Sequence, residues 1–322
     1  MRAARLAAPR QFEFIDVDTP TMNPGESIVR MEYVSICGSD LRTYDRVLPE
    51  ESYPFRAGAP VHECVGVIEE TTSDDFRRGQ RVIAVTNAGG LVEYASVPSS
   101  FLVPVPEDKH QPDEWVLCQP VGTVIYSVQQ MGPMLGKSVV ILGQGPIGLA
   151  FTDLLVRQGA TKVIVSDLVD HRLEVARNLG ATHTINAGRE DVTERVREIT
   201  GGALADVSVD ACGRPEVAHQ VFEVIRRQGT AVIFGMTHTE DVFPFNWAAM
   251  YSKVPRMVVT NSAVSGDRVD CVRTCVDLVS QGRMDFSYMI THRLPWLEVG
   301  KAFDLYSTKK DNSLKIVMSV SK

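Results

Sequence analysis

The sequence predicts an α/β protein in which an irregular β-rich domain is joined to a domain built on a doubly wound parallel sheet. In the first part of the chain, apolar and polar residues alternate in short segments such as 28–34 and 81–85, which is typical of half-buried strands. From residue 138 onward, continuous apolar runs alternate with helical segments, as in a parallel sheet covered on both faces. A chain of 322 residues is long enough to bury two hydrophobic cores.

The elements of the parallel sheet follow in order along the middle of the chain. The run Val139–Leu142 is an expected buried strand, and a helix over 146–158 begins with a proline and stops at Gly159. Gly180 ends the next expected helix, over 170–179, because glycine readily adopts the left-handed conformation at a helix end. The remaining expected elements are strands at 163–165, 207–209, 231–234 and 257–259 and a helix over 215–226.

The last part of the chain is expected to return to the first domain. Only a helix over 268–281 and a strand over 314–320 are predicted there, and two lone elements cannot bury a core of their own. We therefore predict a β-rich domain over 1–120, a nucleotide-binding domain over 121–262, and a returning segment over 263–322.

Composition excludes several classes of function. The formal net charge of −7 gives no basic field for nucleic acid or anionic lipid, so neither is an expected partner. No apolar run reaches the roughly 18 residues of a membrane span, and the start of the chain is too short in apolar residues for a signal peptide. The six cysteines are too few for a disulfide framework and suit a reducing compartment, so we expect a cytoplasmic protein.

A glycine-rich turn predicts a dinucleotide site. Gly143-Gln144-Gly145-Pro146-Ile147-Gly148 follows an expected strand and opens an expected helix. In this arrangement Gly143 allows the tight turn, Gly145 lets the backbone approach a pyrophosphate, and Gly148 lets helix and strand pack closely. The alternative is a glycine-rich turn that binds no ligand.

An acidic residue favours NAD as the nucleotide. Asp167 ends the second expected strand about 20 residues after the glycine turn, where a carboxylate accepts hydrogen bonds from the adenosine ribose and repels a 2′-phosphate. The alternative is that Asp167 only caps the helix beginning at Asp170. We also expect Pro146, Ile147, Arg172 and Thr123 to contact the cofactor.

Three short motifs in and after the first domain carry a family resemblance. They are Cys37-Gly38-Ser39-Asp40, His62-Glu63-Cys64-Val65-Gly66 and Cys118-Gln119-Pro120-Val121-Gly122-Thr123. With the glycine turn, they make the chain resemble the medium-chain, zinc-dependent alcohol and polyol dehydrogenases, particularly those similar to sorbitol and glucose dehydrogenases. The resemblance covers essentially the full length and implies a GroES-like catalytic domain and a Rossmann domain.

The resemblance implies one catalytic zinc. Cys37 and His62 match two of the family's ligands, and Gln119 occupies the third position because Thr123 follows it as in the family. Many relatives have Cys or Glu at that position, and an amide oxygen is a weaker donor. Cys118 as the third ligand is the alternative.

Charge makes the glutamine consequential. Zinc with one thiolate and neutral His62 and Gln119 keeps one net positive charge, which coordination by Glu63 would cancel. Since excess positive charge favours deprotonation of a bound alcohol, we hypothesise that Glu63 exchanges on and off the metal.

Two neighbours of the ligands are expected to assist them. Asp40 is predicted to hold the second imidazole nitrogen of His62, and Ser39 to accept the substrate hydroxyl proton. The family's four-cysteine lobe for a structural zinc has no counterpart after residues 81–85, so no second zinc is expected. Cys64 and Cys118 are interpreted as core thiols, and Cys271 and Cys275 as core or surface thiols.

Together these features predict a zinc- and NAD-dependent dehydrogenase acting on a small alcohol, with polyols, sugars or aminocyclitols favoured. A bulky hydrophobic or tetrapyrrole alcohol is the alternative substrate, because Trp115, Phe101 and Trp247 offer apolar surface. A metal-free quinone or enoyl reductase and a non-catalytic nucleotide sensor are the alternative functions. The resemblance implies a homodimer or homotetramer.

Overall fold

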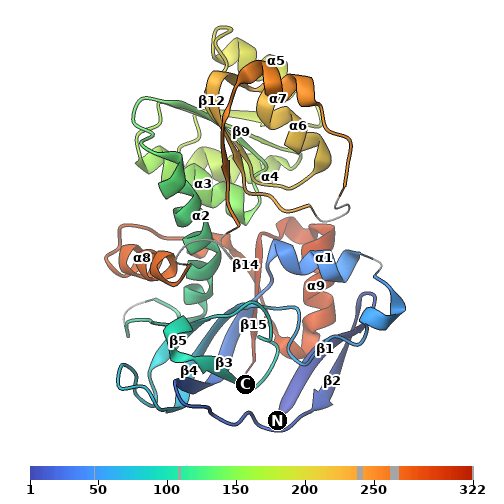
Figure 1. Ribbon diagram of the computed structural model, residues 1–322, viewed down its shortest axis with the longest axis vertical. Helices are drawn as coiled ribbons and strands as arrows, with labels where there is room; N and C mark the ends of the chain where they lie inside the picture. The colour runs from blue at the N-terminus through green and yellow to red at the C-terminus, as the bar shows by residue number, and fades with distance from the viewer. Residues whose placement is uncertain (47, 108–109, 238–241, 262–267, 321–322) are drawn as a thin grey trace. The chain divides into compact units, whose positions relative to one another are not determined.

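The computed structural model describes residues 1–46, 48–107, 110–237, 242–261 and 268–320 and divides into two compact units (Figure 1). The first unit consists of Met1–Thr123 and Asp267–Lys322, and the second of Val124–Gly266. The expected boundary at 120–121 lies close to the observed division, whereas the one at 262–263 falls outside the described residues.

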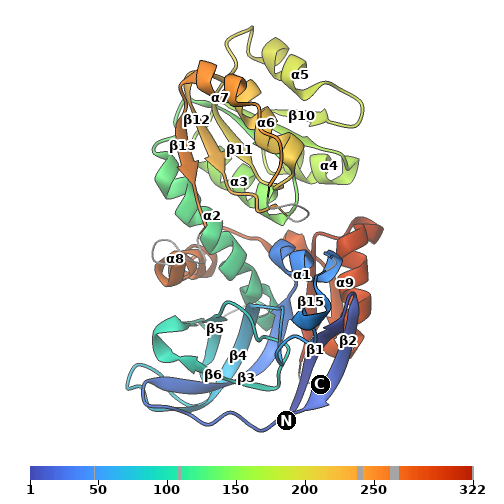
Figure 2. The ribbon, with the colours of Figure 1, turned by 45° about the vertical axis from the view of Figure 1, so that its right-hand side comes forward.

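The second unit is built on a six-stranded parallel sheet with the order β10-β9-β8-β11-β12-β13. Because the order reverses direction after β8, the sheet is doubly wound. Helices lie on both sides of it (Figure 2). The strands are β8 (Ser138–Leu142), β9 (Lys162–Asp167), β10 (His183–Asn186), β11 (Ala205–Asp210), β12 (Ile225–Ile233) and β13 (Arg256–Val259).

The core of this unit forms from the continuous apolar runs that predicted the strands. Val140, Leu142 and Ile164 are fully buried and pack with Val221 and Phe222 from a helix. The helix expected over 215–226 is too long by three residues, because β12 already begins at Ile225. The helices are α3 (Pro146–Arg157), α4 (Asp170–Asn178), α5 (Val192–Ile199), α6 (Pro215–Glu223) and α7 (Trp247–Lys253).

The first unit contains a seven-stranded mixed sheet, with the order β14-β15-β3-β4-β5-β7 and β6 on β3, and the hairpin β1-β2. Its strands are β1 (Arg2–Ala8), β2 (Gln11–Asp16), β3 (Glu26–Ser35), β4 (Glu63–Thr71), β5 (Arg81–Val85), β6 (Tyr94–Pro98), β7 (Leu102–Pro104), β14 (Ile290–Pro295) and β15 (Lys315–Ser319). Its short helix α1 (Leu41–Asp45) follows the 3-10 turn Gly38–Asp40, and α2 (Cys118–Met131) spans the division of the chain between Thr123 and Val124. The predicted fold class is confirmed.

The C-terminal segment supplies more than the expected helix and strand. Besides α8 (Arg268–Ser280) and β15, it contains β14 and α9 (Val299–Thr308). The side chain of Phe303 on α9 packs against Phe12 and Tyr44, with ring centroids 4.8 Å and 4.9 Å apart. Strand β15 lies between β14 and β3, so the end of the chain is the direct neighbour of the strand that leads to Cys37.

A short connection joins β5 to β6 over residues 86–93. It is fixed to the rest of the unit by bridges between Gly58 and Leu91 and between Ala3 and Val92. A Cβ on Gly58, whose φ is 85°, would lie 2.7 Å from the backbone of Gly89, so glycine is required there.

Among the described residues, no helix is long and apolar enough to cross a membrane.

Candidate functional site

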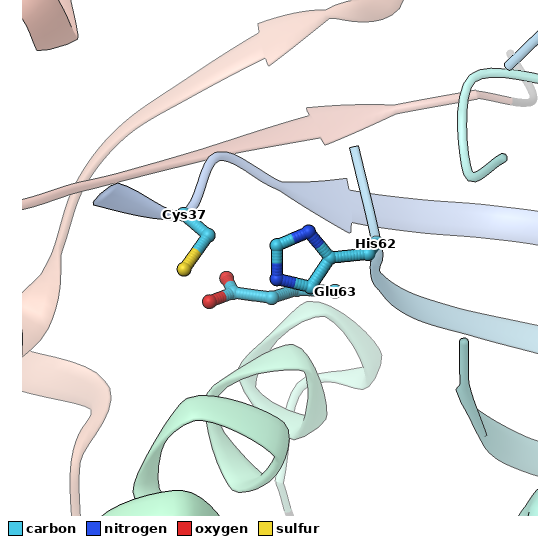
Figure 3. A group of neighbouring side chains, drawn as sticks. All are labelled: Cys37, His62 and Glu63. Carbon is cyan, nitrogen blue, oxygen red and sulfur yellow. The ribbon is translucent and has the colours of Figure 1, made fainter. Parts of the chain in front are cut away.

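Three side chains with metal-binding atoms converge in the first unit. Cys37, His62 and Glu63 each offer one atom, and these atoms all lie within 4.8 Å of one another. Figure 3 shows the thiol, the imidazole and the carboxylate pointing toward one another. It is the one such group of three or more histidine, cysteine or acidic side chains found among the described residues.

The pairing of two central strands produces this convergence. Ser35 at the end of β3 lies opposite Glu63 at the start of β4. Cys37 comes two residues after β3 ends, and His62 comes immediately before β4 begins. The end of β3 and the start of β4 are neighbours in this antiparallel pair, so two distant parts of the sequence meet at the same end of the two strands.

Asp40 orients two of the three side chains. Its Oδ1 lies 2.9 Å from Nδ1 of His62, and its Oδ2 accepts the backbone N–H of Cys37 at 2.9 Å. Burial lowers the pKa of His62, but the charges of Asp40 and Cys37 and their hydrogen bonds outweigh it, so this pKa is raised well above its usual value. With Nδ1 held by a carboxylate, Nε2 is the nitrogen left for a metal, which would compete with the proton there.

Gln119, near the start of α2, presents an acceptor atom without a partner. Its Nε2 donates to the carbonyl of Thr86 at 3.4 Å, and the hydroxyl of Thr86 donates to the carbonyl of His62 at 3.4 Å. The Oε1 of Gln119 is buried and has no hydrogen-bond partner in the described structure. Because a buried polar atom is normally satisfied, this oxygen indicates a missing ligand.

The donor atoms fit a zinc ion. One sulfur, one imidazole nitrogen and oxygens from Glu63 and Gln119 form a mixed set of the kind that zinc accepts. The Oε1 of Glu63 is likewise buried without a hydrogen-bond partner. Glu63 belongs to the group with the thiol and the imidazole, and a cation there would satisfy its buried acceptor atom.

The glycine turn of the second unit has the geometry that its sequence predicts. Gly143 has a φ of 95°, and its N–H donates to the carbonyl of Ser166 at 2.8 Å. A Cβ on Gly148 would lie 1.9 Å from the carbonyl oxygen of Gly143, so no larger residue fits. Gly145 is the N-cap of α3, with Pro146 as its first residue, and the turn is partly exposed at Gly145, Pro146 and Ile147.

Asp167 is joined directly to this turn. Its Oδ2 accepts the backbone N–H of Gln144 at 2.7 Å, and its Oδ1 accepts that of Val169 at 2.9 Å. Val169 is the N-cap of α4, so Asp167 also supports the start of that helix. A guanidinium nitrogen of Arg172 lies 3.8 Å from the point where a Cβ on Gly145 would be. The turn, the carboxylate and Arg172 therefore share one end of the parallel sheet.

Comparison with known proteins identifies the family. A model of the alcohol dehydrogenase GroES-like domain matches residues 23–107, and a model of zinc-binding dehydrogenases matches residues 146–280. The chain belongs to the medium-chain zinc-dependent dehydrogenase family.

Individual relatives of this medium-chain dehydrogenase align over nearly the whole chain. An alcohol dehydrogenase of Cupriavidus necator is 28% identical, and the alignment covers 99% of this chain and 98% of that protein. An L-threonine 3-dehydrogenase of Pyrococcus horikoshii is 29% identical over 91% of this chain and 89% of its own. The structure of an alcohol dehydrogenase from Thermus sp. ATN1 superposes with a TM-score of 0.87 at 24% identity, covering 100% of both chains.

The other thiols near the metal-binding group of this dehydrogenase are buried in the core. Cys118 is outside that group, and its thiol contacts that of Cys275. Burial raises the pKa of Cys64 to about 12, so its thiol stays protonated. Both Cys118, which adjoins Gln119 in the sequence, and Cys64, which adjoins Glu63, are therefore buried thiols of the core.

The sequence analysis missed two residues of this region, Ser35 and Lys315. Both donate a hydrogen bond to the Oε2 of Glu63. A signal was present, because Lys315 interrupts the apolar run over residues 314–318 and lysine is almost never buried unless it is paired. Its partner, however, is 252 residues away in the sequence.

The remaining residues expected at the site have different surroundings. Ser39 is half-buried in the 3-10 turn between Cys37 and Asp40, and the Thr123 hydroxyl donates to the carbonyl of Pro120 at 2.6 Å within α2. Trp115 is only 2% exposed, so it offers no free apolar face, and Trp247 is 65% exposed on α7 of the other unit.

Proposed function

We propose that the protein is a zinc- and NAD-dependent dehydrogenase that oxidises a secondary or primary alcohol, or runs the reverse reaction, with polyols, sugars or aminocyclitols as the favoured substrates. The convergence of Cys37, His62 and Glu63, together with the unpartnered oxygen of Gln119, carries this proposal. The glycine turn and Asp167 support the nucleotide part of it.

Each residue of the first unit has a separate part in the proposed reaction. Cys37, His62 and Gln119 hold the metal, and Asp40 fixes the imidazole of His62 in the required orientation. When bound, zinc would supply Lewis-acid polarisation of the alcohol oxygen, and NAD would supply a hydride acceptor. Ser39, beside the thiolate, accepts the hydroxyl proton and passes its own proton on toward the cofactor ribose and water.

The residues of the second unit bind the nucleotide. The N-terminus of α3 carries unpaired backbone N–H groups and a partial positive charge, both of which favour a pyrophosphate at Gly145. Asp167 accepts hydrogen bonds from the adenosine ribose and disfavours a 2′-phosphate there. Pro146, Ile147 and Arg172 complete the proposed cofactor contacts of this unit, and Thr123, the last residue of the first unit before the division, is a further proposed contact.

Two alanine substitutions separate the roles of the glycines in the turn. Gly145→Ala should leave the free energy of unfolding within about 0.5 kcal/mol of the wild type, because the nearest atom to the new Cβ is 3.8 Å away. It should weaken NADH binding about tenfold by keeping the pyrophosphate at a distance. Gly148→Ala should instead destabilise the protein by about 1–3 kcal/mol through its clash with Gly143.

Denaturant unfolding and NADH fluorescence titration measure the two effects. Equal losses of stability in both variants would contradict the assignment, as would unchanged NADH binding by folded Gly145→Ala.

The substrate class rests on the glutamine and on the short connection after β5. Both features resemble polyol and sugar dehydrogenases more than simple-alcohol dehydrogenases. Threonine, which carries a secondary hydroxyl group, is a second substrate to test because one aligned relative is named L-threonine 3-dehydrogenase.

A screen of NAD⁺ reduction tests the function directly. The zinc-loaded protein should reduce NAD⁺ with at least one polyol, sugar, aminocyclitol or hydroxy amino acid, and activity should disappear on chelation and return with zinc. Turnover only of a quinone or enoyl substrate, unaffected by chelation, would identify a metal-free reductase. NADH binding with no turnover of any alcohol would support a nucleotide sensor. The expected homodimer or homotetramer stays a prediction, which light scattering tests by measuring the molar mass in solution.

A further inference from the structure

Lys315 is a buried cation on the strand next to the metal-binding group. Its side chain is 2% exposed, and its ammonium donates to the carbonyl of Ile36 at 2.9 Å and to the Oε2 of Glu63. Strand β15 pairs with β3 so that Val317 lies opposite Ser35, which in turn lies opposite Glu63. Since alternate residues of a strand share a face, Lys315 projects on the same face as these residues.

The two carboxylate oxygens of Glu63 have different surroundings. Oε2 accepts hydrogen bonds from both the Lys315 ammonium and the Ser35 hydroxyl, whereas Oε1 is buried without a hydrogen-bond partner. Two opposite charges are therefore held together in a site that excludes water.

We propose that Lys315 is a positioning residue that tethers the Oε2 of Glu63, so that this carboxylate can offer only Oε1 to the metal. The inference rests on the proposed zinc site and explains how a glutamate can lie among the ligands without cancelling their charge. Zinc with the Cys37 thiolate and the Glu63 carboxylate is formally neutral, and Lys315 restores one positive charge to the group.

The Lys315 ammonium competes with the metal for the carboxylate of Glu63. Two substitutions of Lys315 should therefore have opposite effects on zinc affinity. Lys315→Met removes the competing cation at similar length, so zinc should bind about tenfold more tightly, a change in the range produced by partners of metal ligands. Lys315→Arg offers a planar fork that can occupy both carboxylate oxygens, so zinc should bind about tenfold more weakly. A lysine with a merely structural role predicts weaker zinc binding in both variants.

Zinc affinity, measured by competition with a chromogenic chelator, is the primary readout. The visible spectrum of the Co²⁺-substituted protein is the second, because it reports the ligands and does not depend on turnover. Thermal unfolding of the metal-free variants shows whether each is folded. Folded Lys315→Met decides between the two accounts, because they predict opposite changes in zinc affinity only for that variant.

The matched control repeats Lys315→Met in a Glu63→Gln background. If Lys315 acts through Glu63, the gain in zinc affinity and the spectral change should both disappear there. Persistence of the full effect in that background would overturn the inference, and so would weaker zinc binding by folded Lys315→Met. A wild-type protein that binds no zinc would overturn the inference together with the proposed function, whereas a zinc-binding wild type with unresponsive Lys315 variants would overturn the inference alone.

Discussion

Replacing Cys37 with serine is expected to remove the metal and the activity while leaving nucleotide binding intact. The substitution removes the only thiol of the group formed with His62 and Glu63, and zinc content should fall below about 0.1 per chain because thiolate is its strongest ligand here. The value of kcat/KM should fall about a thousandfold or more, corresponding to about 4 kcal/mol of barrier. NADH affinity should stay within about twofold, since the glycine turn lies in the other unit.

Cys64→Ala provides the matched control for this variant. Cys64 adjoins Glu63 in the sequence, but its thiol is fully buried and protonated. The control should keep about one zinc per chain at a modest cost in stability. Full zinc content in Cys37→Ser, or zinc loss in a folded Cys64→Ala, would place the metal elsewhere. Loss of both zinc and NADH binding in Cys37→Ser would count as misfolding, which circular dichroism detects.

Replacing Asp167 with serine is expected to have the second largest effect, on the choice of cofactor. Both carboxylate oxygens accept backbone N–H groups at the glycine turn and at the start of α4, so NADH binding should weaken. NADPH binding should improve relative to NADH by about tenfold, because the negative charge that repels a 2′-phosphate is gone. Fluorescence titrations with both nucleotides give this ratio.

Asp170→Ser is the control for charge alone. Asp170 lies three residues further along and pairs with Arg189 and Asn186 at the same end of the sheet. Its loss should leave the NADPH to NADH ratio unchanged. If Asp167→Ser and Asp170→Ser change the NADPH to NADH ratio equally, the effect of Asp167 is one of general charge and not of a direct contact. A wild-type protein that prefers NADPH would contradict the NAD assignment.

The parallel sheet was predictable because local signals agreed with the tertiary structure. Continuous apolar runs such as Val139–Leu142 are long enough to be strands and are followed by glycines that end or turn the chain. Helix α2 escaped prediction because Pro120, Gly122 and several β-branched residues disfavour helix locally, and packing overrides that preference.

The candidate site was predictable in part. Cys37, His62 and Gln119 stood out by residue type and by the family resemblance, and Asp40 is near Cys37 in sequence. The tether of Glu63 was not predictable, because which residue of β15 lies opposite β3 depends on the strand register. The unpartnered oxygens of Glu63 and Gln119 likewise appear only once the chain is folded.

The central claim is that Cys37, His62 and Gln119 hold one zinc ion, with Glu63 at its side. Elemental analysis of the full-length protein, reconstituted with zinc and freed of excess metal, measures this most directly. The account predicts about one zinc per chain in the wild type and almost none in Cys37→Ser. A wild-type protein that retains no stoichiometric zinc after reconstitution, while folded and binding NADH, would contradict it.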